Sequence, residues 1–395
     1  MNKDIKPIVV GSVGTGYGGY LHVHGYQHVT GIPIRLKSIC GRDPEKTEAF
    51  RVKYGYEQCV FDFEDLINDP EIDVIDLSVP PALHIPMSIK ALEAGKHIIC
   101  EKPLSGYFGR EGETEIGRTV KKADMWARMS EDLDKLKAVI DKSKAKFLYA
   151  ENFIYSTPVQ KAAEIIRAKK SKIVMMNGEE LIIGSTSPLA GQWKNFGGGT
   201  TMRNGIHILS SMIYLKMCEA KARGEEFKIV SVTAENAQQT KALKEDEKAY
   251  IRARPDDVED MTCIIVTFWD GTKAVVVASD ATLGGSQNHI DVYTNDSTLR
   301  CTLTNNNLLE AYTADTNGLD NVEWGELVRP QDKIGWNNVY VSDPIIRGYV
   351  GEMQSFCESI AYDRAPETGF DIAYEIIRVV YASFRSAEEG RRIML

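Results

Sequence analysis

A glycine motif directly after the first predicted strand constrains the fold of this chain more than any other feature. The apolar run at 8–13 leads into a Gly-x-Gly-x-x-Gly pattern, and a helix-like stretch follows it to residue 29. In such a βαβ unit the first glycine makes a tight turn, the second admits a pyrophosphate, and the third lets helix and strand pack closely. The helix N-terminus also attracts phosphate. The sequence therefore predicts a dinucleotide site formed by Gly14, Thr15, Gly16, Tyr17 and Gly19.

The rest of the first 152 residues continues as a doubly wound parallel sheet would. Strand-like apolar runs at 36–40, 73–79, 97–100 and 147–152 alternate with helix-like stretches, among them 85–94 and 131–142. Closely spaced strands and helices in alternation predict an α/β fold with helices on both faces of parallel strands. We therefore expect an α/β Rossmann domain at 1–152.

Polar residues and prolines stand where several of these strands end. Ligands bind at the carboxyl edge of an open α/β sheet, so residues at these strand ends are candidates for the cofactor site. The Glu101-Lys102-Pro103 sequence is the most distinctive, although a solvated strand end is the simpler interpretation of such a triplet alone. The expected cofactor contacts at this edge are Val79, Pro80, His84, Glu101, Lys102 and Asn152.

The end of the second strand bears on the choice of dinucleotide. An NAD-specific site usually has Asp or Glu about 20 residues after the glycines, bound to the ribose 2′-hydroxyl. This chain has Gly41 followed by Arg42, and arginine suits a 2′-phosphate or stacking on adenine. Arg42 and Asp43 are equally well explained as the first turn of a helix. The expected cofactor is therefore NAD(H) or NADP(H).

Residues 106–129 interrupt the alternating pattern with many charges and four glycines. The segment begins two residues after Leu104, so it leaves the sheet beside the predicted site. Long loops next to a site are often functional. A mobile lid, an arm that contacts a partner and a solvated surface insertion all remain open.

The second half, 153–395, is predicted to be an α+β domain for substrate binding and oligomerisation. Closely spaced strand-like runs end in turn sequences such as Asp270-Gly271 and Asn295-Asp296, which indicate hairpins. A large, mainly antiparallel open sheet follows from this pattern, and one of its faces could form a subunit contact. We also expect the C-terminal helix to pack back on the first domain. The predicted strands are 173–183, 227–234, 261–269, 272–279, 289–294 and 298–304.

A second glycine-rich segment, Gly197–Gly199, precedes a helix predicted to run to about 217. Arg203 and His207 are four residues apart and would share a helix face. A histidine near the start of a helix that follows a glycine loop is a candidate general base, although a buried structural histidine fits equally well. Substrate contacts are expected from Lys102, Trp193, Thr200, Asn204 and His207, with Trp193 also at the cofactor.

Composition narrows the class of protein and its partners. A chain of 395 residues is long enough for two domains, because single cores stop growing at roughly 250–300 residues. The net charge of −9 argues against a nucleic-acid partner, and no apolar run suits a membrane span. Seven scattered cysteines and a polar N-terminus indicate a cytoplasmic protein with reduced thiols. His22, His24 and His28 lack further ligands at metal-site spacing, so no metal is expected.

These motifs together resemble the Gfo/Idh/MocA family of NAD(P)-dependent oxidoreductases across nearly the whole chain. The resemblance rests on the glycine motif with His22, on residues 80–84 and 91–97, on Glu101-Lys102-Pro103, and on residues 193–194, 197–199, 205–207 and 386–391. It implies that Lys102 and His207 are catalytic. The family usually has Asp where this chain has Arg203, which we therefore include among the catalytic candidates. An arginine there would lower the pKa of His207 and favour its neutral form.

Arg203, the 106–129 segment and Gly178-Glu179-Glu180 resemble a narrower group, the gut-bacterial glycoside 3-dehydrogenases. That resemblance implies oxidation of the glucosyl C3 hydroxyl of C- or O-glycosides such as puerarin, with the 3-keto product cleaved by a partner lyase. The cofactor of such enzymes can stay bound and be recycled in place. Alternatives are an NAD-dependent glycosidase that oxidises, eliminates and reduces, an inositol or polyol dehydrogenase, and a sensor that binds the cofactor without turnover. A homo-oligomer is expected.

Overall fold

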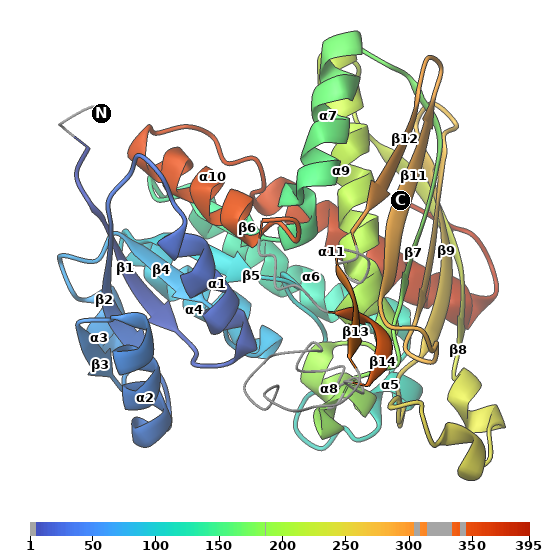
Figure 1. Cartoon of the computed structure of the whole chain (residues 1–395), viewed down its shortest axis with the longest axis horizontal. Helices are drawn as coiled ribbons and strands as arrows, with labels where there is room; N and C mark the ends of the chain where they lie inside the picture. Colours follow the sequence, from blue (N-terminus) through green and yellow to red (C-terminus); the bar gives the residue numbers. More distant parts are fainter. Residues whose placement is uncertain (1–4, 186, 304–308, 314–333, 340–344) are drawn as a thin grey trace.

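The computed structural model describes residues 5–185, 187–303, 309–313, 334–339 and 345–395. Two sheets stand apart with helices packed between and around them (Figure 1). The fold class predicted from the sequence is confirmed: a parallel Rossmann sheet is followed by a larger, mainly antiparallel one. In the part of the chain described, no helix combines the length and apolar character needed to cross a membrane.

The first sheet has six parallel strands in the order β3-β2-β1-β4-β5-β6. Strand β1, with the fully buried sequence Ile-Val-Val-Gly-Ser-Val, lies between β2 and β4, where the strand order reverses. Such a reversal opens a crevice at the carboxyl ends of the strands, which is where ligands bind in these folds. The strands are β1 (Ile8–Val13), β2 (Ile34–Cys40), β3 (Gln58–Val60), β4 (Val74–Leu77), β5 (His97–Glu101) and β6 (Phe147–Ala150).

Helices that connect these strands form both outer layers of the first domain. α2 illustrates the local signals: Asp43 caps its N-terminus, Pro44 opens it, and Gly55 ends it with φ +80°. The other helices of this half are α1 (Tyr17–Gln27), α3 (Phe63–Ile67), α4 (His84–Glu93), α5 (Ile116–Thr119) and α6 (Lys122–Ile140), and α2 spans Pro44–Tyr54.

The second sheet has seven strands in the order β12-β11-β7-β10-β9-β8-β15. Only β7 and β10 pair in parallel, and the two predicted hairpins are present at Asp270-Gly271 and Asn295-Asp296. Its strands are β7 (Ile173–Leu181), β8 (Ile229–Ala237), β9 (Met261–Phe268), β10 (Lys273–Ser279), β11 (Gln287–Thr294), β12 (Thr298–Thr302) and β15 (Ile393–Met394). The end of the strand predicted at 298–304 lies outside the described residues, and β15 was not predicted.

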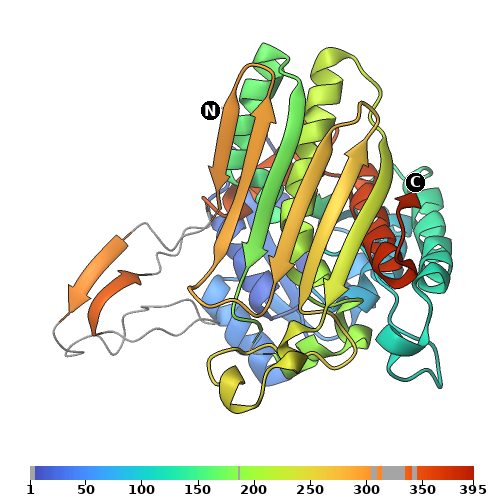
Figure 2. The same ribbon diagram turned by 90° about the vertical axis from the view of Figure 1, so that its right-hand side faces the viewer.

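One face of the second sheet is covered by helices and the other is open, as Figure 2 shows. α9 packs on β7 and α11 on β8, which explains the alternation of buried and more exposed residues along β9 and β10. α11 also contacts α6, and α10 packs on α1. These helices are α7 (Thr157–Lys169), α8 (Trp193–Phe196), α9 (Ile206–Arg223), α10 (Tyr349–Ala361) and α11 (Phe370–Glu389); β13 (Leu309–Thr313) and β14 (Gly335–Val339) pair separately.

Residues 106–129 differ from the prediction in one respect. The helix expected at 131–142 is α6, which begins at Lys122 and ends at Ile140, so the second part of the segment is helical. In the first part Tyr107 and Ile116 are buried, and the backbone N–H of Gly117 donates to Oδ2 of Asp257 in the second domain at 2.9 Å. The backbone N–H of Tyr107 donates to the hydroxyl of Tyr381 on α11 at 2.6 Å. In this structure the segment therefore ties the two domains together.

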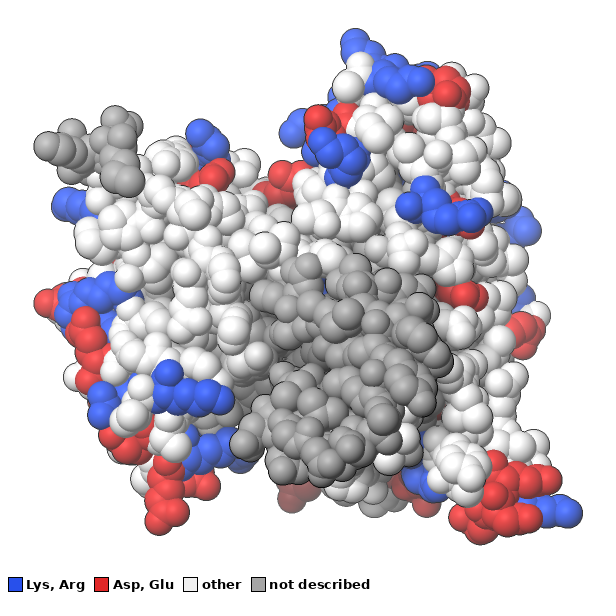
Figure 3. All heavy atoms as spheres, in the orientation of Figure 1, with Lys and Arg blue, Asp and Glu red and all other residues white. Residues whose placement is uncertain are grey.

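Charged side chains of both signs are interspersed on the face shown in Figure 3. Exposed acidic residues also follow one another in the surface turn formed by Glu245, Asp246 and Glu247. A mixed surface of this kind suits a small-molecule partner better than a polyanion such as nucleic acid.

Candidate active site

The glycine loop between β1 and α1 has the shape that a dinucleotide requires. A Cβ at Gly14 (φ +109°) would lie 2.1 Å from the Ser78 carbonyl oxygen, and one at Gly19 would lie 2.4 Å from the Gly14 carbonyl oxygen. Gly16 is different: it begins α1 without a side-chain cap, and nothing lies within 4 Å of its Cβ position. The N-terminus of α1 therefore has no side-chain cap, and uncapped helix N-termini attract phosphate groups. Tyr17 at this N-terminus is 44% exposed.

The end of β2 lacks a free carboxylate for the ribose. A Cβ at Gly41 would lie 2.2 Å from Oγ1 of Thr47 and 3.2 Å from the Thr15 methyl group. Asp43, the nearest acid, accepts from the backbone N–H of Lys46 and is used as a helix cap. Arg42 is exposed at this edge.

Glu101 is held in place by a buried charge network that the sequence did not reveal. His22 on α1 lies between two carboxylates, 2.7 Å from Oδ1 of Asp76 and 3.1 Å from Oε1 of Glu101, and is 1% exposed. Burial alone would lower the pKa of His22, but the two carboxylates raise it well above its ordinary value. Burial alone would raise the pKa of Glu101, but His22 lowers it. His22 is thus an imidazolium that donates from both ring nitrogens.

The residues after β4 and β6 have contacts of their own. The ring nitrogens of buried His84 face the carbonyl oxygens of Pro103 (2.7 Å) and Val79 (3.0 Å), which joins two strand ends next to the Lys102–Pro103 cis peptide bond. Val79 is half-buried, whereas Pro80 is exposed. Asn152 donates its amide to the Arg347 carbonyl oxygen at 2.7 Å, which anchors the chain just before α10.

Lys102 connects the two domains at the centre of the candidate site. Its Nζ donates to the carbonyl oxygen of Arg203 at 2.6 Å, and its backbone N–H donates to Oε2 of Glu101 at 2.8 Å. Burial lowers the pKa of Lys102, an effect that the carboxylates of Glu151 and Glu101 oppose. The amine therefore lies between the edge of the first sheet and the turn that precedes α9.

His207 on α9 is paired with Glu151, which sequence reasoning missed. Nδ1 of His207 lies 2.5 Å from Oε1 of Glu151, a fully buried residue between β6 and Asn152. Phe153 stacks on the imidazole with ring centroids 4.6 Å apart. Because a carboxylate only accepts, Nδ1 carries hydrogen, and Nε2 is the ring nitrogen left for a substrate. The polar residue beside Asn152 at the end of a buried strand was the signal available in the sequence.

The Arg203 side chain, which we expected to share a helix face with His207, makes its ion pair with a different residue. Residues Thr201–Gly205 form a π-helical turn, and the Arg203 guanidinium ion-pairs with Asp280 after β10. Thr200 and Asn204, expected at the substrate, donate to the same carboxylate at 3.2 and 2.6 Å. Burial lowers the pKa of Arg203 to about 10, which leaves it charged at neutral pH. Among the described residues, the charged group at the His207 imidazole is Glu151 and not Arg203.

The backbone of the second glycine segment lies close to another part of the protein, at Glu259. A Cβ at Gly199 would lie 1.9 Å from the Glu259 carbonyl oxygen. The backbone N–H groups of Gly199 and Thr201 donate to the buried carboxylate of Glu259 at 3.0–3.1 Å. The glycines therefore admit Glu259, which positions the turn before α9.

Trp193 packs at the domain contact in this structure. Its indole is 2% exposed, donates to the Tyr107 carbonyl oxygen at 3.1 Å and packs on Phe384. The ammonium of Lys122 lies 4.9 Å from the indole ring. These contacts replace the cofactor and substrate contacts that the sequence suggested for Trp193.

The structure explains the histidine and acidic clusters without a metal. The rings of His24 and His28 stack on each other at the end of α1, away from buried His22. Within the described residues, one acidic group has suitable geometry, formed by Glu219, Glu225 and Asp270. Lys172 already lies 2.7–3.0 Å from all three carboxylates, so an ammonium fills that space.

Sequence comparison finds curated relatives that match part of this chain. Levoglucosan dehydrogenase of Pseudarthrobacter phenanthrenivorans is 38% identical over 103 residues, 24% of this chain and 26% of that protein. A glycosyl hydrolase family 109 protein of Shewanella pealeana is 33% identical over 105 residues, 24% of this chain and 23% of that protein. The aligned parts thus span about a quarter of these curated relatives.

Solved structures share the fold over nearly the whole chain. GenD2 from gentamicin A biosynthesis, in complex with NAD, aligns with a TM-score of 0.75 at 20% identity, covering 99% of this chain and 97% of GenD2. Levoglucosan dehydrogenase in complex with NADH and levoglucosan aligns with a TM-score of 0.69 at 20% identity, covering 98% and 99%.

Both halves also match one family. Residues 8–124 match the oxidoreductase family with an NAD-binding Rossmann fold, and residues 165–395 match its C-terminal alpha/beta domain. The prediction of a nicotinamide-dinucleotide-binding Rossmann domain is confirmed by the first match. The chain belongs to the Gfo/Idh/MocA family of oxidoreductases.

Proposed function

We propose that this protein oxidises a secondary hydroxyl of a sugar or glycoside by hydride transfer to NAD or NADP, at C3 of a glucosyl group in a C- or O-glycoside. The observation that carries the proposal is the 2.6 Å hydrogen bond from Nζ of Lys102 to the Arg203 carbonyl oxygen. This bond brings the lysine of the first domain to the turn that leads into His207. A base and a hydrogen-bonding imidazole thereby lie together at the carboxyl edge of the sheet, beside the glycine loop.

The residues of the chain divide the chemistry as follows. The loop at Gly14–Gly19 and the N-terminus of α1 bind the pyrophosphate, and the bound nicotinamide supplies the hydride acceptor. The hydroxyl proton passes to Lys102 or to Nε2 of His207. Burial favours the neutral amine of Lys102, the form that accepts a proton. Glu151 orients the imidazole and stabilises it when it becomes charged.

A ketone at C3 prepares the sugar for cleavage by another enzyme. The carbonyl acidifies the hydrogen on C2, so a base can remove it and expel the substituent at C1. We therefore propose a separate eliminating enzyme, a lyase, as the consumer of the product. The absence of an acid at Gly41 and the exposed Arg42 support use of NADP as well as NAD.

The similarity to a glycosyl hydrolase family 109 protein supports one alternative, a glycosidase that oxidises, eliminates and reduces in a single site. Such an enzyme would release aglycone without net accumulation of a keto sugar. A polyol dehydrogenase would instead prefer inositols to glycosides. The products therefore separate the three functions.

The test is mass spectrometry of the nucleotide in the purified protein and of the products, before and after incubation with a panel of substrates. The panel contains methyl glucoside, an aryl C-glucoside, levoglucosan and myo-inositol, each with added NAD or NADP. The proposal requires reduced nucleotide together with a glucoside lighter by two hydrogens, with the ketone at C3 by NMR. Aglycone release without ketone, or oxidation of inositol alone, would refute it.

We also propose that the open face of the second sheet binds another copy of this chain. Exposed apolar side chains lie on this face, with Ile265 (38% exposed) opposite Val275 on β10 and Met175 (42% exposed) on β7. The ion pair Arg300–Asp291 and the polar pair His289–Glu179 lie toward one edge. An apolar centre with a polar rim is typical of an interface. Light scattering should give a mass of at least two chains of 44.1 kDa each.

A further inference from the structure

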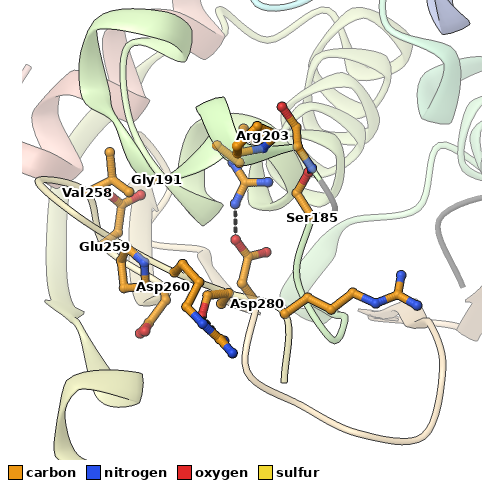
Figure 4. A pocket seen from close by; sticks show the side chains of 14 residues that line it. Ser185, Gly191, Arg203, Val258, Glu259, Asp260 and Asp280 are labelled. Carbon is orange, nitrogen blue, oxygen red and sulfur yellow. Dashed lines mark hydrogen bonds and ion pairs between the residues drawn. The ribbon is translucent and has the colours of Figure 1, made fainter. Parts of the chain in front are cut away.

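A pocket of about 160 Å³ opens beside the turn that carries Arg203 (Figure 4). Its walls come from the segment after β7, the turn at Arg203, residues 252–260 before β9, and Asp280 after β10. A cavity of about 150 Å³ is large enough for a benzene ring. The pocket is therefore large enough for a six-membered ring or for an acidic substituent with a few water molecules.

The carboxylates of this pocket are already bound by donors of the protein. Figure 4 shows Arg203 directed at Asp280, with Glu259 and Asp260 on one side of this pair and Ser185 on the other. Asp280 also accepts from Thr200 and Asn204. Asp260 accepts from the backbone N–H groups of residues 239 and 240, and Glu259 accepts from those of residues 199 and 201. The carboxylate oxygens of Asp260, Glu259 and Asp280 therefore already accept hydrogen bonds from the protein.

The arginines of the pocket have donors left over. Nη1 of Arg252 is buried, and no acceptor among the described residues lies within hydrogen-bond distance of it. Nε of Arg203 is likewise buried and has no acceptor among the described residues. Arg254 uses Nη1 for the carbonyl oxygens of Ile251 and Ala253 in its own loop. A guanidinium has five N–H donors, and a buried charged donor without an acceptor is costly, so this arrangement favours an anionic occupant.

We propose that this pocket binds a carboxylate carried by the substrate, so that the preferred substrates are acidic sugars or acidic glycosides. The inference rests on the proposed sugar oxidation, because Arg203 belongs to both places. Its carbonyl oxygen accepts from Lys102, while its guanidinium lines the pocket. A single residue, Arg203, thus joins the lysine of the proposed reaction to the wall of the pocket. Arginine and carboxylate form paired, charge-assisted hydrogen bonds, which supply the selectivity.

The carboxylate could belong to the sugar or to the aglycone, and matched substrates distinguish the two sources. Methyl glucuronide is compared with methyl glucoside, and 4-carboxyphenyl glucoside with phenyl glucoside. We expect a higher kcat/KM for the acidic member of at least one pair. In Arg252→Gln the ratio of acidic to neutral kcat/KM should fall about tenfold to a hundredfold, the range for one charge-assisted hydrogen bond. Arg252→Lys, which keeps the charge but loses the planar fork, should lie between the two.

The control is Arg364→Gln, an exposed arginine on the loop after α10 that should leave the ratio unchanged. Equal use of acidic and neutral sugars by the wild type, or an unchanged ratio in both Arg252 variants, would overturn the proposal. Calorimetry with glucuronate separates it from the proposed oxidation. Glucuronate binding that depends on Arg252 without any sugar oxidation would support the pocket and refute the dehydrogenase. Sugar oxidation without a preference for acidic substrates would support the dehydrogenase and refute the carboxylate pocket.

Discussion

Replacing His22 with glutamine should destabilise the first domain strongly, because this ring separates the buried carboxylate of Asp76 from the largely buried carboxylate of Glu101. His22 donates to Asp76 at 2.7 Å and to Glu101 at 3.1 Å, and Asp76 has a second buried oxygen without a partner among the described residues. Removing one partner of a buried charge pair costs about 3–5 kcal/mol, since the remaining charges stay buried. For a cooperative unit of about 150–250 residues, each kcal/mol lowers Tm by about 2–4 °C. The expected loss is therefore about 6–20 °C.

The effect should depend on pH in a direction set by the two pKa shifts. The pKa of His22 is raised on folding, so its stabilisation is complete below about pH 6.5 and is lost as the pH rises through the folded value. The pKa of Glu101 is lowered, so its stabilisation is complete above about pH 4.5 and is lost at more acidic pH. The gap in Tm between wild type and His22→Gln should thus be widest from about pH 4.5 to 6.5 and should narrow toward alkaline pH.

Differential scanning calorimetry across this pH range measures the gap directly. His24→Gln is the matched control, because His24 lies on the same helix and is only partly buried, with its pKa lowered first by burial and then by the neighbouring His28 and Lys53. The control should change Tm little. A gap that widens with rising pH, or a loss no larger than that of the control, would refute the assignment of His22 as a buried imidazolium.

Three further predictions concern the site and the open sheet face. Lys102→Met should abolish sugar oxidation while nucleotide still binds, as measured by fluorescence titration with NADH; retained turnover would exclude Lys102 as the base. Glu151→Gln should lower kcat about a hundredfold or more with a smaller change in KM, and should move the acidic limb of the pH–rate profile, because the amide no longer stabilises a charged His207. Ile265→Glu should dissociate the oligomer by light scattering without lowering the monomer's Tm, since this side chain is on the open face.

Much of the fold could be predicted because its signals are local. Gly14 and Gly19 belong to one short motif that directly follows a strand, so their pattern is readable in the sequence even though the atom that a Cβ at Gly14 would meet belongs to Ser78. The alternation along β9 and β10 likewise records which side of each strand meets helices. Helix starts are less certain from sequence: charges around residues 122–129 suggested a loop, whereas Met125 and Met129 are buried on one face of α6.

The partners within the site could not be predicted, because each lies far away in the sequence. Glu151 meets His207 across 56 residues, and Asp76 meets His22 across 54. Arg203 was placed beside His207 on the assumption of a regular helix with four-residue spacing. The π-helical turn at Thr201–Gly205 changes that register, and Asp280 from another strand then takes the guanidinium. Such pairings follow from the packing of two sheets, which no local pattern encodes.

Lys102 and His207, the proposed acid–base groups, are connected by two contacts that cross between the domains in opposite directions. Lys102, from the first sheet, donates to a carbonyl oxygen of the turn before α9. His207, from α9, is oriented by Glu151 at the end of β6 in the first sheet. In the family pattern an aspartate four residues before the histidine would lie on the histidine's own helix. Here that position is Arg203, so the orienting carboxylate comes from the other domain. Both the position of the amine and the tautomer of the imidazole therefore depend on the same domain contact, and loosening that contact should impair both groups together.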